Sequence, residues 1–241
     1  IRDITSQYRK SYFGIIWAFV NPLTTGLVWI FLNMTGTIRM SDTGIPYPVF
    51  AFSGTLLWSI INEAINLPTN STGSGISSKI NYPKEALLVT GFYHLMFNSF
   101  IKIILLLIFL WVFGVGFHLS LLWFPLALMG TIFFGITIGL FLTPLGMLYS
   151  DVSRIKGLIL KFMMYITPVV YIIPKEGILK TLMEINPITP LILTARDLIV
   201  GQSPTYLTYY LLIMLLCIPL FMIALVFYRI SIPILVERMS A

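Results

Sequence analysis

Few residues of this 241-residue chain have the types and spacing that catalysis, metal binding or nucleotide binding needs. His94 and His118 are the only histidines, and they flank a long apolar stretch, so neither has a partner at metal-ligand spacing. No Ser-His-Asp arrangement can be built with the available acids. The segment "GSGISSK" (73–79) resembles a phosphate-binding loop, but Ser78 stands where the second glycine is needed and Ile80 follows the lysine. The sequence therefore predicts no catalytic residue, no metal site and no ATP bound through this motif.

Two charged residues, Glu63 and Lys102, stand inside long apolar stretches. Because a charge at bilayer depth costs about 3 kcal/mol, each should face protein or water and find a partner. One loop joins their two segments, so the two residues are able to pair with each other. Two interpretations stay open. The first is structural: a pair that fixes packing, or a Lys102 that snorkels toward the interface. The second places one of the two residues on a transport path.

The composition shows which elements must position these residues. Hydrophobic residues make up 58% of the chain and charged residues only 10%, whereas a soluble domain carries about 25% charged residues. Runs such as "IKIILLLIFLWVFGVGF" (101–117) do not alternate as the strands of a membrane β-barrel do. We therefore predict an all-α integral membrane protein with a single membrane domain, 1–241, and six transmembrane helices. The predicted spans are about 17–37, 48–68, 91–116, 121–149, 157–173 and 206–228.

The distribution of lysine and arginine predicts the orientation of these spans. With a cytoplasmic N-terminus, ten such residues fall inside and four outside. The inside set is Arg2, Arg9, Lys10, Lys79, Lys84, Arg154, Lys156, Lys161, Arg229 and Arg238. The outside set is Arg39, Lys175, Lys180 and Arg196. We expect both termini in the cytoplasm, and we attribute the net charge of +6 to topology and membrane lipids, with no nucleic-acid partner.

Three segments outside the spans carry distinctive patterns. Residues 1–16 place polar and basic side chains on one face and apolar ones on the other, which predicts an amphipathic helix in the interface. Residues 77–88, "SSKINYPKEALL", form a charged cytoplasmic segment between two apolar runs. Residues 174–205 are too long for a simple turn and predict two short outer helices that re-enter the membrane, with Pro187 and Pro190 at their junction.

Aromatic residues are frequent in and near the spans, and two interpretations apply to them. Most suit the aromatic belts at the membrane interfaces. Others could line a channel, because sugar rings present apolar C–H faces that stack on aromatic rings. The candidate channel residues are Trp17, Phe19, Trp29, Phe52, Trp58, Tyr165 and Tyr171.

Four motifs, in order, resemble the permeases of polysaccharide-exporting ABC transporters. They are "RDITSQYRKSYFGIIWAFVNPL" (2–23), "KINYPKEAL" (79–87), "MLYSDVSRI" (147–155) and "TPVVYIIP…INPITPLILTARDLI" (167–199). Two positions depart from the family pattern: Tyr82 replaces the usual phenylalanine, and Ser150 stands where arginine is common. The resemblance extends over nearly the whole chain.

This resemblance implies a homodimer that works with two copies of a separate ATPase subunit, which binds ATP and Mg, so this chain needs no cofactor of its own. A lipid-linked polysaccharide would cross at the dimer interface. The implied cytoplasmic gate consists of Arg2, Asp3, Tyr8, Arg9 and Tyr12. The implied ATPase-coupling helix, within 77–88, includes Lys79, Ile80, Asn81, Tyr82, Pro83, Lys84 and Glu85. The implied outer gate, within 174–205, includes Asn186, Pro187, Pro190, Arg196 and Asp197.

The functional expectation is therefore the membrane subunit of an O-antigen-like polysaccharide exporter in the bacterial inner membrane, and not an enzyme. An exporter of the same class for a drug, an antibiotic or another lipid is the first alternative. The second is an integral membrane enzyme acting on lipid-linked sugars, which would need clustered acids, histidines or arginines at one membrane face. Only Glu184, Arg196 and Asp197 gather in this way.

Overall fold

The computed structural model describes residues 16–36, 44–72 and 84–240, and within these ranges the regular structure is entirely helical. The elements are α2 (Ile16–Met34), α3 (Tyr47–Thr72), α4 (Lys84–Val112), the 3-10 helix η1 (Leu119–Trp123), α5 (Phe124–Leu148), α6 (Ser150–Ile166), α7 (Ile178–Ile185), α8 (Ile188–Val200) and α9 (Leu207–Ser240). The predicted all-α class is confirmed.

Four of the predicted spans correspond to helices that are long and apolar enough to cross a membrane. They lie at Tyr47–Thr72, Glu85–Val112, Leu119–Leu148 and Leu207–Leu235. The helices at the predicted first and fifth spans are shorter, with 19 residues in α2 and 17 in α6. The chain is thus a multi-pass helical membrane protein, while the number of six spans stays a prediction.

The fifth helix lies about seven residues earlier in the chain than the predicted range 157–173. A single extended residue, Tyr149, separates α5 from α6, so most of the expected loop at 147–155 is helical. At its other end α6 stops because Thr167 is extended, with φ −105° and ψ 137°. A residue before proline is driven out of the helical region, and Pro168 follows here.

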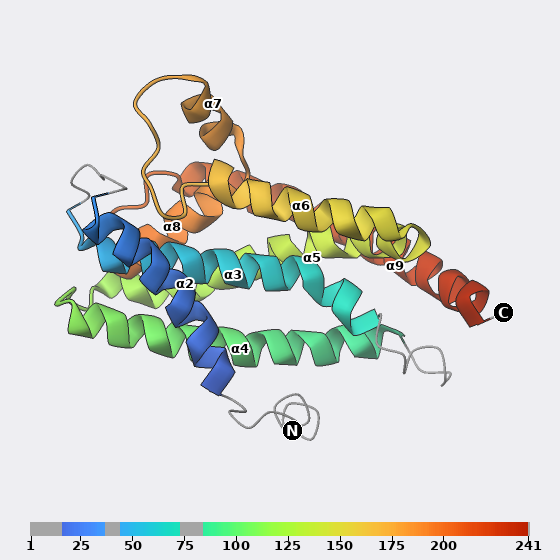
Figure 1. Cartoon of the computed structure of the whole chain (residues 1–241). Coiled ribbons are helices and arrows are strands. Elements are labelled where there is room, and N and C mark those ends of the chain that lie inside the picture. Colours follow the sequence, from blue (N-terminus) through green and yellow to red (C-terminus); the bar gives the residue numbers. More distant parts are fainter. Residues whose placement is uncertain (1–15, 37–43, 73–83, 241) are drawn as a thin grey trace.

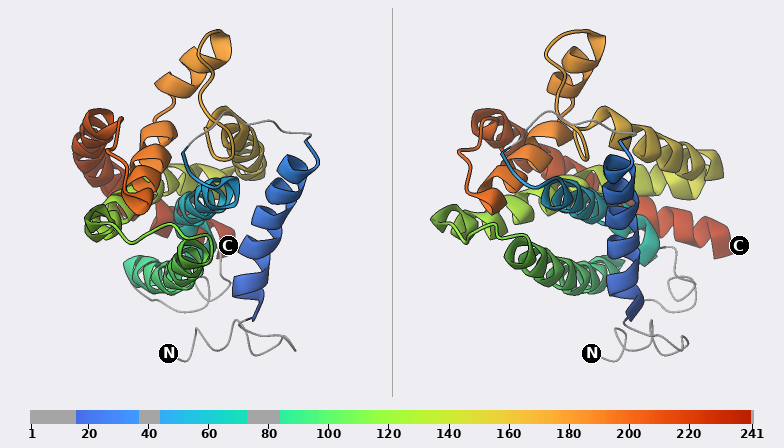
Figure 2. Two further views of the ribbon diagram at one scale, coloured as in Figure 1. Left: turned by 90° about the vertical axis from the view of Figure 1, so that its left-hand side faces the viewer. Right: turned by 60° about the vertical axis from the view of Figure 1, so that its left-hand side comes forward.

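α3 is the central helix, and it packs against α2, α4, α5 and α8, while α9 packs mainly against α5. Figures 1 and 2 show α3, α4, α5, α6 and α9 running alongside one another, with α2 crossing them and α7 standing away from the bundle. In the most apolar window of α3, 78% of the residues are buried, against 22% in α9. α3 therefore forms the core, and α9 presents most of its surface to lipid.

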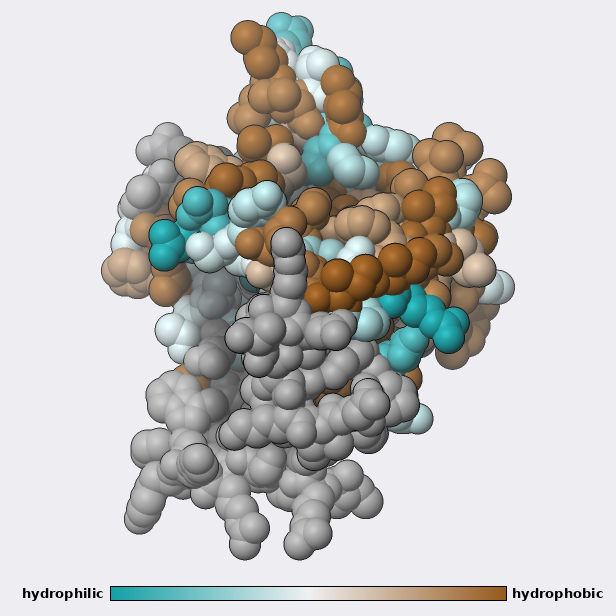
Figure 3. Space-filling view, turned by 90° about the vertical axis from the view of Figure 1, so that its right-hand side faces the viewer, coloured by the Kyte–Doolittle hydropathy of each residue, from teal (hydrophilic) through white to brown (hydrophobic). Residues whose placement is uncertain are grey.

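The helix ends alternate between the two ends of the bundle. The end of α3, the start of α4, the α5–α6 junction and the end of α9 lie together on the right in Figure 1. The end of α4, η1, α7 and α8 lie at the other end. In the view onto the right-hand end, hydrophobic surface surrounds small hydrophilic patches (Figure 3). This alternation is what repeated membrane crossing requires, and which end faces the cytoplasm stays a prediction.

Two glycines allow α5 to approach α3 closely. Gly135 and Gly139 form a G-x-x-x-G pattern on one face of α5. A Cβ added at Gly135 would lie 2.6 Å from the Cβ of Ala64, and one at Gly139 would lie 2.8 Å from Cδ of Pro68. This close contact fixes the helix that carries the polar residues described next.

Candidate functional site

A stripe of polar residues runs along one face of α3. Thr55, Ser59, Asn62 and Asn66 follow one another at intervals of four, three and four residues, which places them on the same side of a helix. The Asn66 side-chain amide donates to the backbone carbonyl of Asn62 at 2.9 Å and to its Oδ1 at 2.8 Å. The stripe thus carries hydroxyl and amide groups through a helix that is otherwise apolar.

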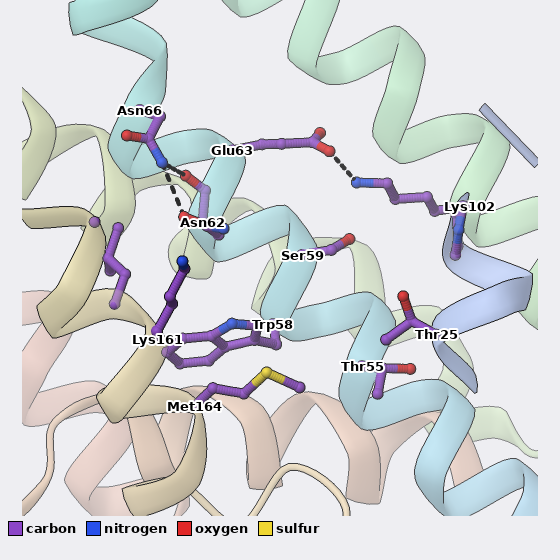
Figure 4. A pocket seen from close by; sticks show the side chains of 13 residues that line it. Thr25, Thr55, Trp58, Ser59, Asn62, Glu63, Asn66, Lys102, Lys161 and Met164 are labelled. Carbon is purple, nitrogen blue, oxygen red and sulfur yellow. Dashed lines mark hydrogen bonds and ion pairs between the residues drawn. The ribbon is translucent and has the colours of Figure 1, made fainter. Parts of the chain in front are cut away.

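This stripe faces a cavity of about 480 Å³ between α2, α3, α4 and α6, which we call the polar cavity (Figure 4). Its polar lining residues are Thr25, Thr55, Ser59, Asn62, Glu63, Asn66, Lys102 and Lys161. Its other lining residues are Pro22, Trp58, Gly157, Leu160 and Met164. A polar cavity beside helices of membrane-spanning length is a candidate path or binding site for a hydrophilic ligand.

The two intramembrane charges meet in the wall of the polar cavity. Lys102 Nζ donates to Glu63 Oε1 at 2.5 Å, which confirms the predicted pair (Figure 4). The Lys102 side chain is 7% exposed and that of Glu63 is 40% exposed, so Glu63 is the more exposed member of the pair. Glu63 Oε2 is buried and accepts no hydrogen bond from the residues described.

α6 completes the cavity with Lys161 and Met164, which lie near Trp58 in Figure 4. A chain of polar contacts connects α6 to the two helices behind it. Lys156 Nζ donates to Thr69 Oγ1 of α3 at 3.0 Å, and Thr69 Oγ1 lies 2.9 Å from Thr143 Oγ1 of α5. These bonds hold α6 in place at one end of the cavity.

The polar cavity combines groups that suit a polyhydroxylated ligand. Its hydroxyls, amides and carboxylate donate and accept hydrogen bonds, and the largely buried Trp58 side chain adds apolar surface to the lining. Within the described ranges, no three His, Cys, Asp or Glu side chains gather as metal ligands. The arrangement is that of a site that binds and guides a ligand.

Of the predicted channel aromatics, Trp58 lines the polar cavity. Phe52 is fully buried and stacks on Phe109 with ring centroids 4.1 Å apart. Tyr165 is exposed on α6. The others, Phe19, Trp29 and Tyr171, are partly buried against the core. Trp17 belongs to α2, but its side chain falls outside the described part of the chain. The channel role of these residues stays a prediction.

Arg196 of the predicted outer gate is almost fully buried, at 2% exposure. Its Nη1 donates to the Pro168 carbonyl at 3.1 Å, its Nη2 donates to the Val169 carbonyl, and its Cζ lies 3.9 Å from the ring centroid of Phe50. The guanidinium therefore joins α8 both to α3 and to the connection that follows α6. Gly54 of α3 makes this possible, because a Cβ there would collide with the Val169 carbonyl and with Arg196 Nη2.

The other outer-gate residues shape the ends of α7 and α8. Asn186 Nδ2 donates to Thr167 Oγ1 at 2.8 Å, and its Oδ1 accepts the Ile188 N–H at 3.0 Å, where α8 begins. Asp197 Oδ2 accepts the Thr205 N–H at 3.4 Å. Burial raises the pKa of the Asp197 carboxyl, and the Thr205 N–H and the Arg196 charge oppose this rise.

Pro187 and Pro190 lie where α7 gives way to α8, as predicted. The two short helices of 174–205 are therefore present. Their re-entry into the membrane and their gating role stay predictions.

Most residues of the predicted cytoplasmic elements lie outside the described ranges. These are the gate residues Arg2, Asp3, Tyr8, Arg9 and Tyr12, and the coupling residues Lys79, Ile80, Asn81, Tyr82 and Pro83. Lys84 is the first residue of α4, so residues 84–88 of the predicted coupling helix belong to a long helix. Glu85 Oε1 lies 3.3 Å from Arg229 Nε of α9.

Sequence reasoning missed six polar residues of the cavity: Thr25, Thr55, Ser59, Asn62, Asn66 and Lys161. The four on α3 show a signal, because polar residues at helical spacing inside an apolar span indicate a face turned away from lipid. Lys161 lies within the predicted span 157–173 but was assigned to the cytoplasmic charges. Its position inside an apolar stretch was the overlooked signal.

Comparisons with known proteins agree with this architecture. A family model described as "ABC-2 type transporter" matches residues 1–200. Two proteins of Klebsiella pneumoniae, each named O-antigen export system permease protein RfbA, are 24% identical to this chain over 215 residues, covering 85% of this chain and 80% of the relative. A protein of the same name from Myxococcus xanthus is 22% identical over 195 residues, covering 79% of this chain and 74% of the relative.

Proposed function

Because this chain belongs to the ABC-2 type transporter family, we propose that it forms the channel of an ATP-driven exporter for a lipid-linked, O-antigen-like polysaccharide. Transport would run from the cytoplasm across the bacterial inner membrane, with both termini of the chain in the cytoplasm. The names of the relatives, O-antigen export system permease proteins, support the polysaccharide as the cargo.

The observation that carries this proposal is the polar cavity. A glycan needs partners for its hydroxyls and a flat surface for its rings, and the stripe on α3 together with Trp58 offers both. Such contacts are individually weak, so a chain can move past them without being held.

The channel would be completed by a second copy of the chain and by α2 and α6 as spanning helices. At 1.5 Å per residue, α2 and α6 would rise about 28 Å and about 25 Å, close to the thickness of about 30 Å of the hydrocarbon core. Both helices border the polar cavity. In a homodimer whose subunits meet along α2 and α6, two such cavities would face a common path.

Energy for transport would come from two copies of an ATPase subunit that bind ATP and Mg. We propose that residues 77–88 dock on this subunit as a coupling helix, that residues 1–16 form a gate helix at the cytoplasmic entrance, and that α7 and α8 form the outer gate. ATP binding would favour one of two arrangements of the membrane helices, and hydrolysis would restore the other.

The proposal is tested with Trp58→Ala and a matched variant, Trp111→Ala, in cells that depend on this chain for polymer export. Trp58 lines the polar cavity, whereas Trp111 is 74% exposed on α4 and does not. Losing one stacking surface worth about 1 kcal/mol should slow export roughly fivefold in Trp58→Ala only. The readout is surface polymer, normalised to the amount of the permease in the membrane.

A pull-down in mild detergent should also recover an ATPase subunit with the wild-type chain. Recovery of no ATPase would overturn the assignment as an ABC exporter. Equal export by the two tryptophan variants would show that the polar cavity is not part of the transport path. Export of an apolar compound and no polymer would favour the drug or lipid exporter.

A further inference from the structure

A second cavity, of about 420 Å³, lies between α3, α4, α5 and α9. It shares no lining residue with the polar cavity, because α5 and α9 line it in place of α2 and α6. Every residue that lines it is apolar except Glu85 at its end. We call it the α4–α9 groove, and the transport path proposed above makes no use of it.

The groove is long. Its lining on α5 extends from Met129 to Leu140, which is about 16 Å along a helix. This length matches one leaflet of a membrane whose hydrocarbon core is about 30 Å thick. An acyl chain that lies along α5 would therefore contact apolar side chains over the depth of one leaflet.

The groove ends at a positively charged side chain. Phe221 and Leu225 of α9 line it, and Arg229 follows on the same face one turn further along. Arg229 Nε lies 3.3 Å from Glu85 Oε1, and its side chain is 74% exposed. A guanidinium has five N–H donors, so the contact with Glu85 leaves others to bind a second anion.

We propose that the α4–α9 groove is a binding site for one membrane glycerophospholipid with an anionic headgroup. One acyl chain lies in the groove along α5, and the phosphate accepts hydrogen bonds from Arg229. The length of one leaflet, the apolar lining and the arginine at the end of the groove together favour this occupant. Basic groups at the ends of membrane helices commonly bind anionic lipid headgroups.

The acyl-chain arm is tested with Val89→Trp and Val112→Trp in the full chain, by native mass spectrometry in detergent. Val89 lines the groove and is 54% exposed, so a tryptophan there can occupy the groove without displacing the buried core. Val112 is 62% exposed at the far end of the same helix and outside the groove. The probes are dioleoyl phosphatidylglycerol and dioleoyl phosphatidylcholine. Val89→Trp should weaken the binding of both lipids, and Val112→Trp should bind them as the wild type does.

The headgroup arm uses Arg229→Gln, with Arg154→Gln as its control. Arg154 is 80% exposed, and its nearest acid is Asp151, at 3.8 Å. The wild type and Arg154→Gln should bind phosphatidylglycerol about tenfold more tightly than phosphatidylcholine, because both lipids carry the phosphate but only phosphatidylcholine carries a positive choline group that the arginine repels. Arg229→Gln should lose this preference and still bind both lipids.

Three results would overturn the proposal. Equal lipid binding by Val89→Trp and Val112→Trp would place the lipid elsewhere. A headgroup preference that survives in Arg229→Gln would show that Arg229 does not bind the headgroup. Conversion of a dimer to a monomer by Val89→Trp alone would mean that a second copy of the chain covers the groove. None of these outcomes depends on whether the exported cargo is a polysaccharide.

Discussion

At the scale of single residues, the pair of Glu63 and Lys102 is unequal, and this inequality predicts how each substitution acts. Glu63→Gln leaves the almost fully buried ammonium of Lys102 without its counter-charge, whereas Lys102→Met leaves the charge on Glu63, whose side chain is 40% exposed. Breaking a buried pair costs about 3–5 kcal/mol, and the partial exposure of Glu63 places this pair near the low end. We expect Glu63→Gln to lower the unfolding free energy more than Lys102→Met.

The double variant Glu63→Gln with Lys102→Met distinguishes the two interpretations left open by the sequence. It should recover most of the lost stability, measured by SDS-induced unfolding in mixed micelles, because no buried charge then lacks a partner. If the pair only fixes packing, export should recover together with stability. Stability that recovers while export stays low would place Glu63 on the transport path. Equal destabilisation by the two single variants would contradict the inequality.

Gly54 gives a second prediction at this scale. A methyl group there would collide with the Val169 carbonyl and with Arg196 Nη2, so Gly54→Ala should destabilise the protein by about 1–3 kcal/mol, as overpacking of a core does. Gly157 of α6 is the matched control, because an added Cβ there meets no atom within 4 Å. Gly157→Ala should stabilise the helix by about 0.5–1 kcal/mol. Thermal unfolding of the two variants in one detergent compares them, and a Gly54→Ala protein as stable as the wild type would contradict the close contact.

The sequence could predict the Glu63–Lys102 pair because two charges in apolar runs must be partnered. It could not predict the partner of Arg196, which binds the carbonyls of Pro168 and Val169 and no acid. Backbone carbonyls are equally present at every position, so the residue types give no sign of which ones a buried guanidinium will meet. The same holds for Gly54, whose role depends on a loop more than 100 residues away.

At the scale of elements, α9 is bonded to the helices on both sides of the predicted coupling segment. Tyr228 OH lies 2.6 Å from Thr72 Oγ1 at the end of α3, and the adjacent Arg229 contacts Glu85 in the first turn of α4. Displacement of either helix end would therefore also act on α9. We expect the hydrogen bond between Tyr228 and Thr72 to contribute to the unfolding free energy.

A double-mutant cycle with Tyr228→Phe and Thr72→Val tests this contact. The coupling energy should be about 1 kcal/mol, the net value of a buried hydrogen bond. Tyr209→Phe is the control, because its hydroxyl bonds the Ile185 carbonyl at an exposed position and should contribute less. The unfolding free energy of each variant is the measurement, and additive effects of Tyr228→Phe and Thr72→Val would show that the two hydroxyls do not interact.

The helices differ in how well their sequence predicts them. α4, α5 and α9 follow from apolar runs of more than 20 residues, for which hydrophobicity alone is sufficient. α6 was misplaced because Asp151, Arg154 and Lys156 lower the hydropathy of its first half, and the apolar residues after Pro168 extend the apparent span. The helix continues through the charged residues because none of its residues is fully buried in protein, so the charges stay at least partly exposed, and it ends before Pro168.

At the scale of the whole molecule, the family match ends at residue 200, yet α9 belongs to the same bundle. It packs along α5 and closes the second hydrophobic cluster, formed by Leu140, Ala224, Tyr228 and Ile232. In our proposals the protein thus has two functional sides around α3: the polar cavity beside α2 and α6, and the apolar groove beside α9. The second is covered by lipid in our proposal, which leaves the first for the cargo.

The orientation of this bundle is the last prediction, and it follows from charge. Lysine and arginine favour the cytoplasmic side, so the bundle end with the α5–α6 junction should be cytoplasmic and the loop before α9 should be outside. Ser150 and Ser203 are exposed at these two places, and Cys217 is buried. In a Cys217→Ala background, we expect Ser203→Cys to react with a membrane-impermeant maleimide in intact spheroplasts, and Ser150→Cys to react only after permeabilisation. The reverse pattern would invert the protein in the membrane and place the proposed coupling segment out of reach of any cytoplasmic ATPase.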